Sequence, residues 1–139
     1  DYIKTRIKDE AANGTINTSD ARQKQNIRPI SYGLDAVMRM KPVLFEWKNK
    51  PEDGSKPGFL AQDLLKVIPE VVVTKEKEVD RETGKVSFKE AASLGVYYSD
   101  LIPVLAKAIQ EQQAMIQQQQ ETIDKLKDEV DEIKQIMRM

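Results

Sequence analysis

Large apolar residues recur at a seven-residue spacing through the last third of the chain. One series, at the a positions of a heptad, is Ile102, Ile109, Ile116, Ile123, Val130 and Met137. A second series, three residues later at the d positions, is Leu105, Gln112, Gln119, Leu126 and Ile133. Pro103 lies in the first turn, where its missing N–H has no intrahelical partner, and no Gly or Pro follows it. The pattern predicts one helix over residues 101–139, capped by Asp100 and about 58 Å long.

This apolar seam predicts association with copies of the same chain. A helix of this length cannot bury the whole seam against a domain made of residues 19–100, so we expect a parallel coiled coil. The alternative is a single helix lying across its own domain, which the pattern disfavours beyond residue 115. The d series mixes Leu, Gln and Ile, so periodicity alone leaves the number of strands open. The Gln112 and Gln119 layers would weaken the coil while fixing its register.

Shorter patterns ahead of this helix predict a small head. Apolar residues at helical spacing indicate two short helices, one starting from Ser31 and one over residues 60–68, and a proline follows each of them closely. Residues 43–47 alternate between apolar and polar, as a half-buried strand does. Residues 71–73 and 86–88 predict the two strands of a hairpin with a charged tip. The head therefore mixes short helices with a β-hairpin.

The remaining features of the head complete the predicted fold. Residues 50–57 are rich in Pro and Gly and predict a loop, and residues 94–98 predict another short strand. Four aromatic residues are expected to pack within the head, with contact to an upstream stalk as the alternative for the tryptophan: Phe45, Trp47, Phe59 and Tyr98. The fold class is α+β, a small head followed by a long coiled-coil helix. We expect three parts: residues 1–18 end an upstream stalk, residues 19–100 form the head, and residues 101–139 form the coil.

Composition excludes several classes of function. The 139 residues carry a net charge of −1, so no electrostatic attraction to nucleic acid or to an anionic membrane is expected. The absence of Cys and His excludes disulfides, His-dependent triads and the common zinc sites, and neither a metal nor a cofactor is expected. No apolar run reaches the ~20 residues of a membrane span. Proton transfer near neutral pH must therefore use Lys, Asp, Glu, Tyr or water.

One polar segment stands out as candidate chemistry. Residues 19–27 read Ser-Asp-Ala-Arg-Gln-Lys-Gln-Asn-Ile. On spacing alone, Ser, Asp and Arg near a turn are typical of a helix cap and a solvated face, because a short motif is only a hypothesis without its structural context. Ser19 and Lys24 are five residues apart, which is about 17 Å along an extended strand. If they act together, the chain between them must turn or Lys24 must come from a neighbouring subunit.

The segment resembles the opening of a known family. Every specified position of Ser-Asp-x-Arg-x-Lys-x-Asn-Ile is present, the signature of the intramolecular chaperone auto-processing domain of endosialidase tailspikes and tail fibres, also found in a membrane-bound eukaryotic transcription factor. Further stretches similar to that family follow in order, at residues 42–47, 58–63, 68–72 and 96–111. The resemblance covers about residues 19–116. The charged stretch from Lys75 to Lys85 departs from it, and Leu60 and Asp63 replace the commoner Ile and Glu.

The resemblance implies a reaction and its residues. In the family a Ser–Lys dyad cuts the bond before the serine, so Ser19 would be the nucleophile, Lys24 the base, and Thr18–Ser19 the bond. A serine hydroxyl needs an adjacent base, and a lysine amine serves where burial disfavours its charged form. Three neighbours would orient the turn or stabilise the oxyanion, and a plain structural hydrogen bond is the alternative for each of them, above all for the first and last: Asp20, Arg22 and Asn26. The enzyme implied is a self-cleaving serine endopeptidase that acts once.

The resemblance also implies partners and a setting. The chain would be the C-terminal chaperone of a phage-type tail fibre or tailspike, would form a homotrimer, and would contact the upstream stalk of its own polypeptide. It would belong to a virion-associated precursor assembled in the host cytoplasm, and cleavage would release it. Two alternatives stay open: a trimerisation module that does not cleave, and an unrelated coiled-coil adaptor with a small α+β head.

Overall fold

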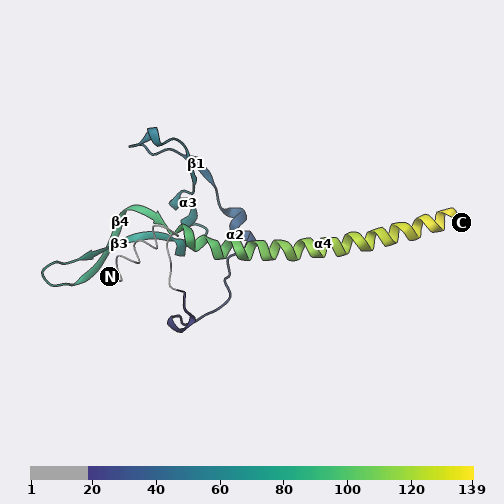
Figure 1. The fold of residues 1–139 in the computed structure, drawn as a ribbon, viewed down its shortest axis with the longest axis horizontal. Helices are drawn as coiled ribbons and strands as arrows, with labels where there is room; N and C mark the ends of the chain where they lie inside the picture. The colour runs from purple at the N-terminus through teal and green to yellow at the C-terminus, as the bar shows by residue number, and fades with distance from the viewer. Residues whose placement is uncertain (1–18) are drawn as a thin grey trace, which may run out of the picture.

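The computed structural model describes residues 19–139 and shows a small α+β head with one long C-terminal helix (Figure 1). Helix α4 runs from Leu101 to Arg138, 38 residues without a break. The head holds short helices and strands: α2 (Leu34–Arg39), α3 (Ala61–Leu65), β1 (Val43–Phe45), β2 (Lys56–Gly58), β3 (Val72–Val79) and β4 (Val86–Val96). Four 3₁₀ turns connect them: η1 (Ala21–Gln23), η2 (Pro51–Asp53), η3 (Pro69–Val71) and η4 (Tyr98–Asp100). The fold class predicted for the single chain is confirmed.

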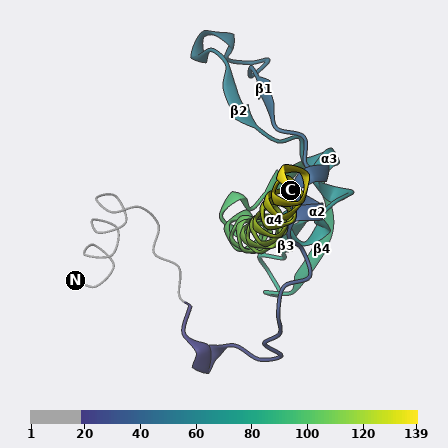
Figure 2. The ribbon, with the colours of Figure 1, turned by 90° about the vertical axis from the view of Figure 1, so that its right-hand side faces the viewer.

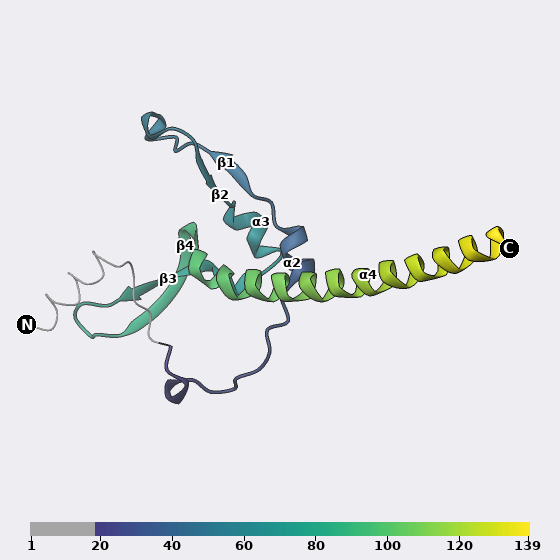
Figure 3. The same cartoon turned by 45° about the vertical axis from the view of Figure 1, so that its right-hand side comes forward.

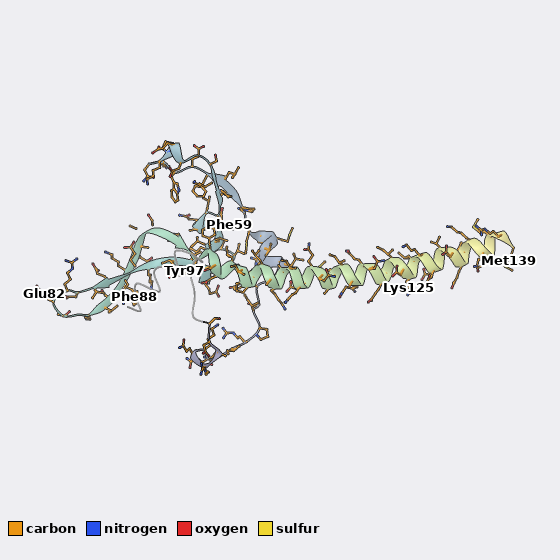
Figure 4. The ribbon with its side chains drawn as sticks, viewed as in Figure 1. Phe59, Glu82, Phe88, Tyr97, Lys125 and Met139 are labelled. Atoms are coloured by element: carbon orange, nitrogen blue, oxygen red, sulfur yellow. The ribbon has the colours of Figure 1, made fainter. Side chains whose placement is uncertain are left out.

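Strands β3 and β4 form the predicted hairpin. They pair antiparallel, with an irregularity between Val73 and Lys75, and Glu82 lies at the tip (Figure 4). At the tip, Asp80 Oδ1 accepts hydrogen bonds from the backbone N–H groups of Glu82 and Thr83, at 2.8 and 3.1 Å. These bonds favour the ionised form, so the pKa of the Asp80 carboxyl lies below its usual value. The short strand predicted at residues 94–98 is wrong as a separate element, because β4 continues to Val96.

Strands β1 and β2 form a second, shorter arm that projects from the head (Figure 3). The predicted loop over residues 50–57 is wrong at its end, since Lys56 and Pro57 pair with Phe45 and Leu44. Gly58 ends β2 where a Cβ would lie 2.8 Å from both a Phe45 ring carbon and the Tyr98 hydroxyl. Only glycine fits that approach, so packing fixes this strand against weak local preference.

The core lies where α2, α3 and η3 meet the first turns of α4. Leu64, Ile68 and Val104 are each only 1% exposed. The remaining buried apolar residues around them are Ala36, Met40, Val71, Val72, Leu101 and Ala108. The aromatic residues behave differently from the prediction: Phe59 packs against this core, whereas Trp47 and Tyr98 are 53% and 50% exposed. The expectation of core packing is therefore wrong for Trp47 and Tyr98, whose rings contact Phe45 and Phe59 while staying half exposed.

Helix α4 has two apolar stripes with different fates. Leu101, Val104 and Ala108 face the head and are buried. The a and d residues beside them stay open to solvent; Ile102 and Ile109, for example, are 64% and 65% exposed. After Glu111 every residue of the helix is exposed, and Lys125 and Met139 mark the part that projects away (Figure 4). The alternative of a helix lying across its own domain is excluded for this projecting part.

The start of α4 differs from the prediction in how Asp100 caps the helix. Asp100 occupies the N-cap position as predicted, but its side chain makes no capping hydrogen bond. Turn η4 leads directly into the helix, so Asp100 has helical angles (φ −74°, ψ −10°) rather than the extended geometry that side-chain capping requires. None of the helices within residues 19–139 combines the length and apolar character of a membrane span.

Candidate functional site

A single turn brings the candidate residues of the N-terminal segment together. Turn η1 folds the chain back after Asp20, with backbone hydrogen bonds of 3.1 Å from Gln23 to Asp20 and from Lys24 to Ala21. The Asp20 carboxylate caps this turn by accepting from the Arg22 backbone N–H at 2.9 Å. The chain between residues 19 and 24 therefore turns, as it must for the two side chains to meet.

The consequence is a direct contact between Lys24 and Ser19. Lys24 Nζ donates a hydrogen bond to Ser19 Oγ at 2.6 Å, within one chain. The distance is within reach for proton transfer between an amine and a hydroxyl. Of the two arrangements left open by the sequence, a local turn or a neighbouring subunit, the single chain adopts the turn. The bond expected to be cut joins Ser19 to Thr18, which lies outside the described residues, as does the whole 1–18 segment.

Asp20 and Arg22 bind each other rather than Ser19 or Lys24. Arg22 Nη2 lies 2.6 Å from Asp20 Oδ2, and Arg22 Nε donates to the same carboxylate. The Arg22 side chain is the main reason that the pKa of the Asp20 carboxyl lies below its usual value, and the same pairing raises the pKa of the guanidinium. Both groups are thus ionised partners that shape the turn.

Asn26 contributes backbone geometry. It is the one residue other than glycine with a positive φ, 55°, among residues 19–139. Asn tolerates this left-handed conformation better than most residues, so Asn26 bends the chain after Lys24. Its carbonyl accepts a hydrogen bond from Arg28, and within the described chain no hydrogen bond of its side chain reaches Ser19 or Lys24. Among the described residues Asn26 thus shapes the backbone, and its expected role in orienting the site stays a prediction.

The turn stands in solvent. Ser19, Lys24 and the residues as far as Ser31 are exposed, apart from the half-exposed Asp20. The segment runs beside an open slot of about 630 Å³, lined on its other side by Glu70, Val71 and Val104. Its attachment to the head starts at Tyr32, whose hydroxyl donates to the Glu70 carboxylate at 2.9 Å. That hydrogen bond is the main cause of a raised pKa for the Tyr32 hydroxyl.

Sequence reasoning missed the residues that attach this segment. Glu111 accepts a hydrogen bond from the Leu34 backbone N–H at 2.9 Å, across 77 positions. Gly33, which precedes Leu34, is buried against the same carboxylate. No periodicity in the sequence shows which residue of a helix reaches another element.

Comparison with known proteins gives a family match that includes this site. Residues 19–73 match the peptidase family model described as chaperone of endosialidase. The match begins at Ser19 and continues through the turn, α2, α3 and both strands of the short arm, about two fifths of the chain. No curated protein matches the chain. This match supports an endosialidase-type intramolecular chaperone domain in residues 19–73.

Proposed function

We propose that the chain is the C-terminal chaperone of a phage-type tail fibre or tailspike, which forms a homotrimer through α4 and then cuts itself before Ser19. The observation that carries this proposal is the 2.6 Å contact between Lys24 Nζ and Ser19 Oγ. That contact lies at the first residues of the family match. Among residues 19–139 no other lysine side chain donates a hydrogen bond to a serine or threonine hydroxyl; Lys85 reaches Thr83 Oγ1 only through its backbone N–H.

The proposed reaction transfers an acyl group from nitrogen to oxygen. With its amine neutral, Lys24 takes the hydroxyl proton of Ser19, and Oγ adds to the carbonyl carbon of Thr18 through a five-membered ring. The C–N bond then breaks as the protonated Lys24 amine gives its proton to the leaving nitrogen, which leaves an ester on Oγ and a free amino group on Ser19. Water hydrolyses the ester into a carboxylate on Thr18 and the regenerated hydroxyl. The atoms balance with water as the one co-reactant.

Assembly would supply what the single chain lacks. A lysine amine acts as a base where burial disfavours its charged form, yet Ser19 and Lys24 are exposed here. Seen along α4, the 19–33 segment and the β1–β2 arm project on opposite sides of the helix (Figure 2). We propose that a neighbouring copy seated on the a and d residues of α4 also covers this segment and excludes water from it. Cleavage would therefore follow assembly.

The chaperone role follows from the order in which contacts form. Stalks with many contacts between distant residues fold slowly, because loop-closure entropy opposes their folding before burial compensates. A helix that associates through local contacts would hold the stalk ends together and raise their effective concentration. The seam of α4 is exposed along its length, from Ile102 to Met137, and is available for this association. Three strands are taken from the family resemblance, since the mixed d series does not select a number.

Mass measurement of the assembled chain tests the cleavage. The wild type should yield a fragment that starts at Ser19, while Ser19→Ala and Lys24→Ala should stay whole. Lys48→Ala is the matched control, because Lys48 is exposed and its side chain has no hydrogen bond within the described residues; it should be cut like the wild type. A wild-type chain that assembles and stays whole would refute the proposed self-cleavage.

That last outcome would leave the second candidate, a trimerisation module that does not cut. The observation that favours it is that the exposed seam of α4 does not depend on Ser19 or Lys24. The unrelated coiled-coil adaptor is set aside, because residues 19–73 match the chaperone family.

A further inference from the structure

The cleavable segment is attached to the head at one end. Within the described chain, the hydrogen bonds and ion pairs of residues 19–31 all stay inside that segment. The first bonds to the rest of the molecule come from Tyr32 and Leu34. The place where the chain leaves the head at residues 32–34 therefore determines where Ser19 and Lys24 lie relative to α4.

Glu111, on α4, binds the chain at this point. Its Oε2 accepts the Leu34 backbone N–H at 2.9 Å in a partly buried position. This N–H opens helix α2, whose N-cap residue, Gly33, offers no side chain for capping. Glu111 therefore satisfies a helix donor that would otherwise lack a partner, and it does so from another element.

Gly33 shows how close the contact is. A Cβ at this position would lie 2.7 Å from Glu111 Cδ and would collide with the carboxylate oxygens. The missing side chain of residue 33 and the carboxylate of residue 111 thus form one joint. Helix propensity alone does not explain this joint. Glycine is tolerated at the start of a helix, but it has no side chain with which to cap the first N–H groups.

Glu111 lies at the boundary between the part of α4 that the head covers and the part that is exposed. It is the last residue of the helix that the head covers, and every later residue is exposed. It precedes Gln112, a d position of the predicted coil. The joint therefore lies where the part of α4 packed on the head meets the part left for other copies.

We infer that Glu111 is a positioning residue, which ties the start of α2 to the coil helix and thereby sets where the Ser19–Lys24 segment leaves the head. This inference rests on the proposed function. It assigns Glu111 no contact with the reacting atoms: it acts through Leu34 and Gly33. Assembly of α4 and placement of the cleavable bond are thereby coupled through one carboxylate.

The experiment uses the full 139-residue chain and follows three properties of each variant. Sedimentation gives the oligomeric state. Hydrogen exchange gives the protection of the Val37 amide of α2 and of the amide of Met40, its C-cap residue. Mass spectrometry gives the rate at which the fragment beginning at Ser19 appears. Glu111→Ala should associate like the wild type, exchange its α2 amides about fivefold faster, as loss of a cap typically gives, and be cut several-fold more slowly. Gly33→Ala should do the same by displacing the carboxylate.

Two variants separate positioning from general stability. Glu111→Gln keeps an oxygen that accepts from Leu34 N–H, so it should restore most of the cleavage rate. Glu121→Ala removes a carboxylate at an exposed f position of the same helix and should match the wild type in all three properties. A wild-type chain that is cut, with assembled Glu111→Ala cut at the same rate, would overturn this inference alone. A wild-type chain that assembles and stays whole would overturn the proposed function and this inference with it.

Discussion

Replacing Ile123 with aspartate tests whether the two apolar stripes of α4 have different roles, one in folding of the head and one in association. Ile123 lies at an a position in the projecting part of the helix and is 45% exposed. Within the described chain it contacts nothing outside its own helix, because the head covers α4 only as far as Glu111. The substitution should therefore leave the head folded and remove association.

The expected size of the effect follows from the exposed area. Full burial of an isoleucine contributes about 1.5–3 kcal/mol, so covering the exposed half of Ile123 contributes roughly 1 kcal/mol per copy. In the proposed trimer this amounts to about 3 kcal/mol, or roughly a hundredfold in the association constant. The desolvation of the new carboxylates opposes association further. A loss of two orders of magnitude or more is expected.

Sedimentation over a range of protein concentrations measures the association constant, and NMR spectra of the head report its fold. The matched control is Gln117→Asp, which introduces the same charge at an exposed b position and should associate like the wild type. If Ile123→Asp associates as strongly as the wild type, the seam is not the interface. If it associates weakly and the NMR signals of the folded head are also lost, the claim that the seam is not needed for the fold of the head is wrong.

Two further predictions concern the head and the turn. Leu64→Ala should cost about 2–5 kcal/mol of unfolding free energy in denaturant titrations of the head, because Leu64 is 1% exposed; a cost below about 1 kcal/mol would contradict its place in the core. Arg22→Ala should raise the pKa of the Asp20 carboxyl toward its ordinary value of 3.8, measured by NMR titration. Because the folded-state pKa is lowered, the pair stabilises the turn above the ordinary pKa and ceases to do so as pH falls through the folded-state pKa; exposure keeps that contribution small. An unchanged titration midpoint would show that the ion pair is not formed in solution.

The long helix was predictable because its signal is repeated. Five heptads of apolar residues and the lack of Gly or Pro after Pro103 each predict α4, and the helix begins at Leu101 as expected. The second stripe of Leu101, Val104 and Ala108 was not predicted, because it occupies only the first turns. A heptad pattern does not show which of two neighbouring stripes a domain will cover.

The short arm was predictable on one side only. Strand β1 alternates clearly, whereas β2 reads Lys-Pro-Gly, a composition that local preference assigns to a loop. Its pairing with β1 depends on tertiary contacts around Gly58, which the sequence does not display. Tertiary packing overrode propensity there, as it often does in short strands.

The candidate site shows where sequence reasoning stopped. The motif named Ser19 and Lys24 but left open a turn or a neighbouring subunit, since five residues span about 17 Å when extended. The turn depends on Asp20 as a cap and on its pairing with Arg22, which are local contacts with little signal beyond residue type. The joint of Gly33 and Glu111 depends on a contact across 77 positions.

The surfaces already covered in one chain suggest an order of events. The head buries Leu101, Val104 and Ala108 without help from another copy, so it forms before association is required. Two parts stay open: the seam of α4 from Ile102 to Met137, and the segment that holds Ser19 against Lys24. On the proposed function, chemistry that depends on excluding water from that segment must wait until other copies cover it. A chain that has folded but not assembled would therefore keep its stalk attached, and the attached stalk is the part that association of the helices helps to fold.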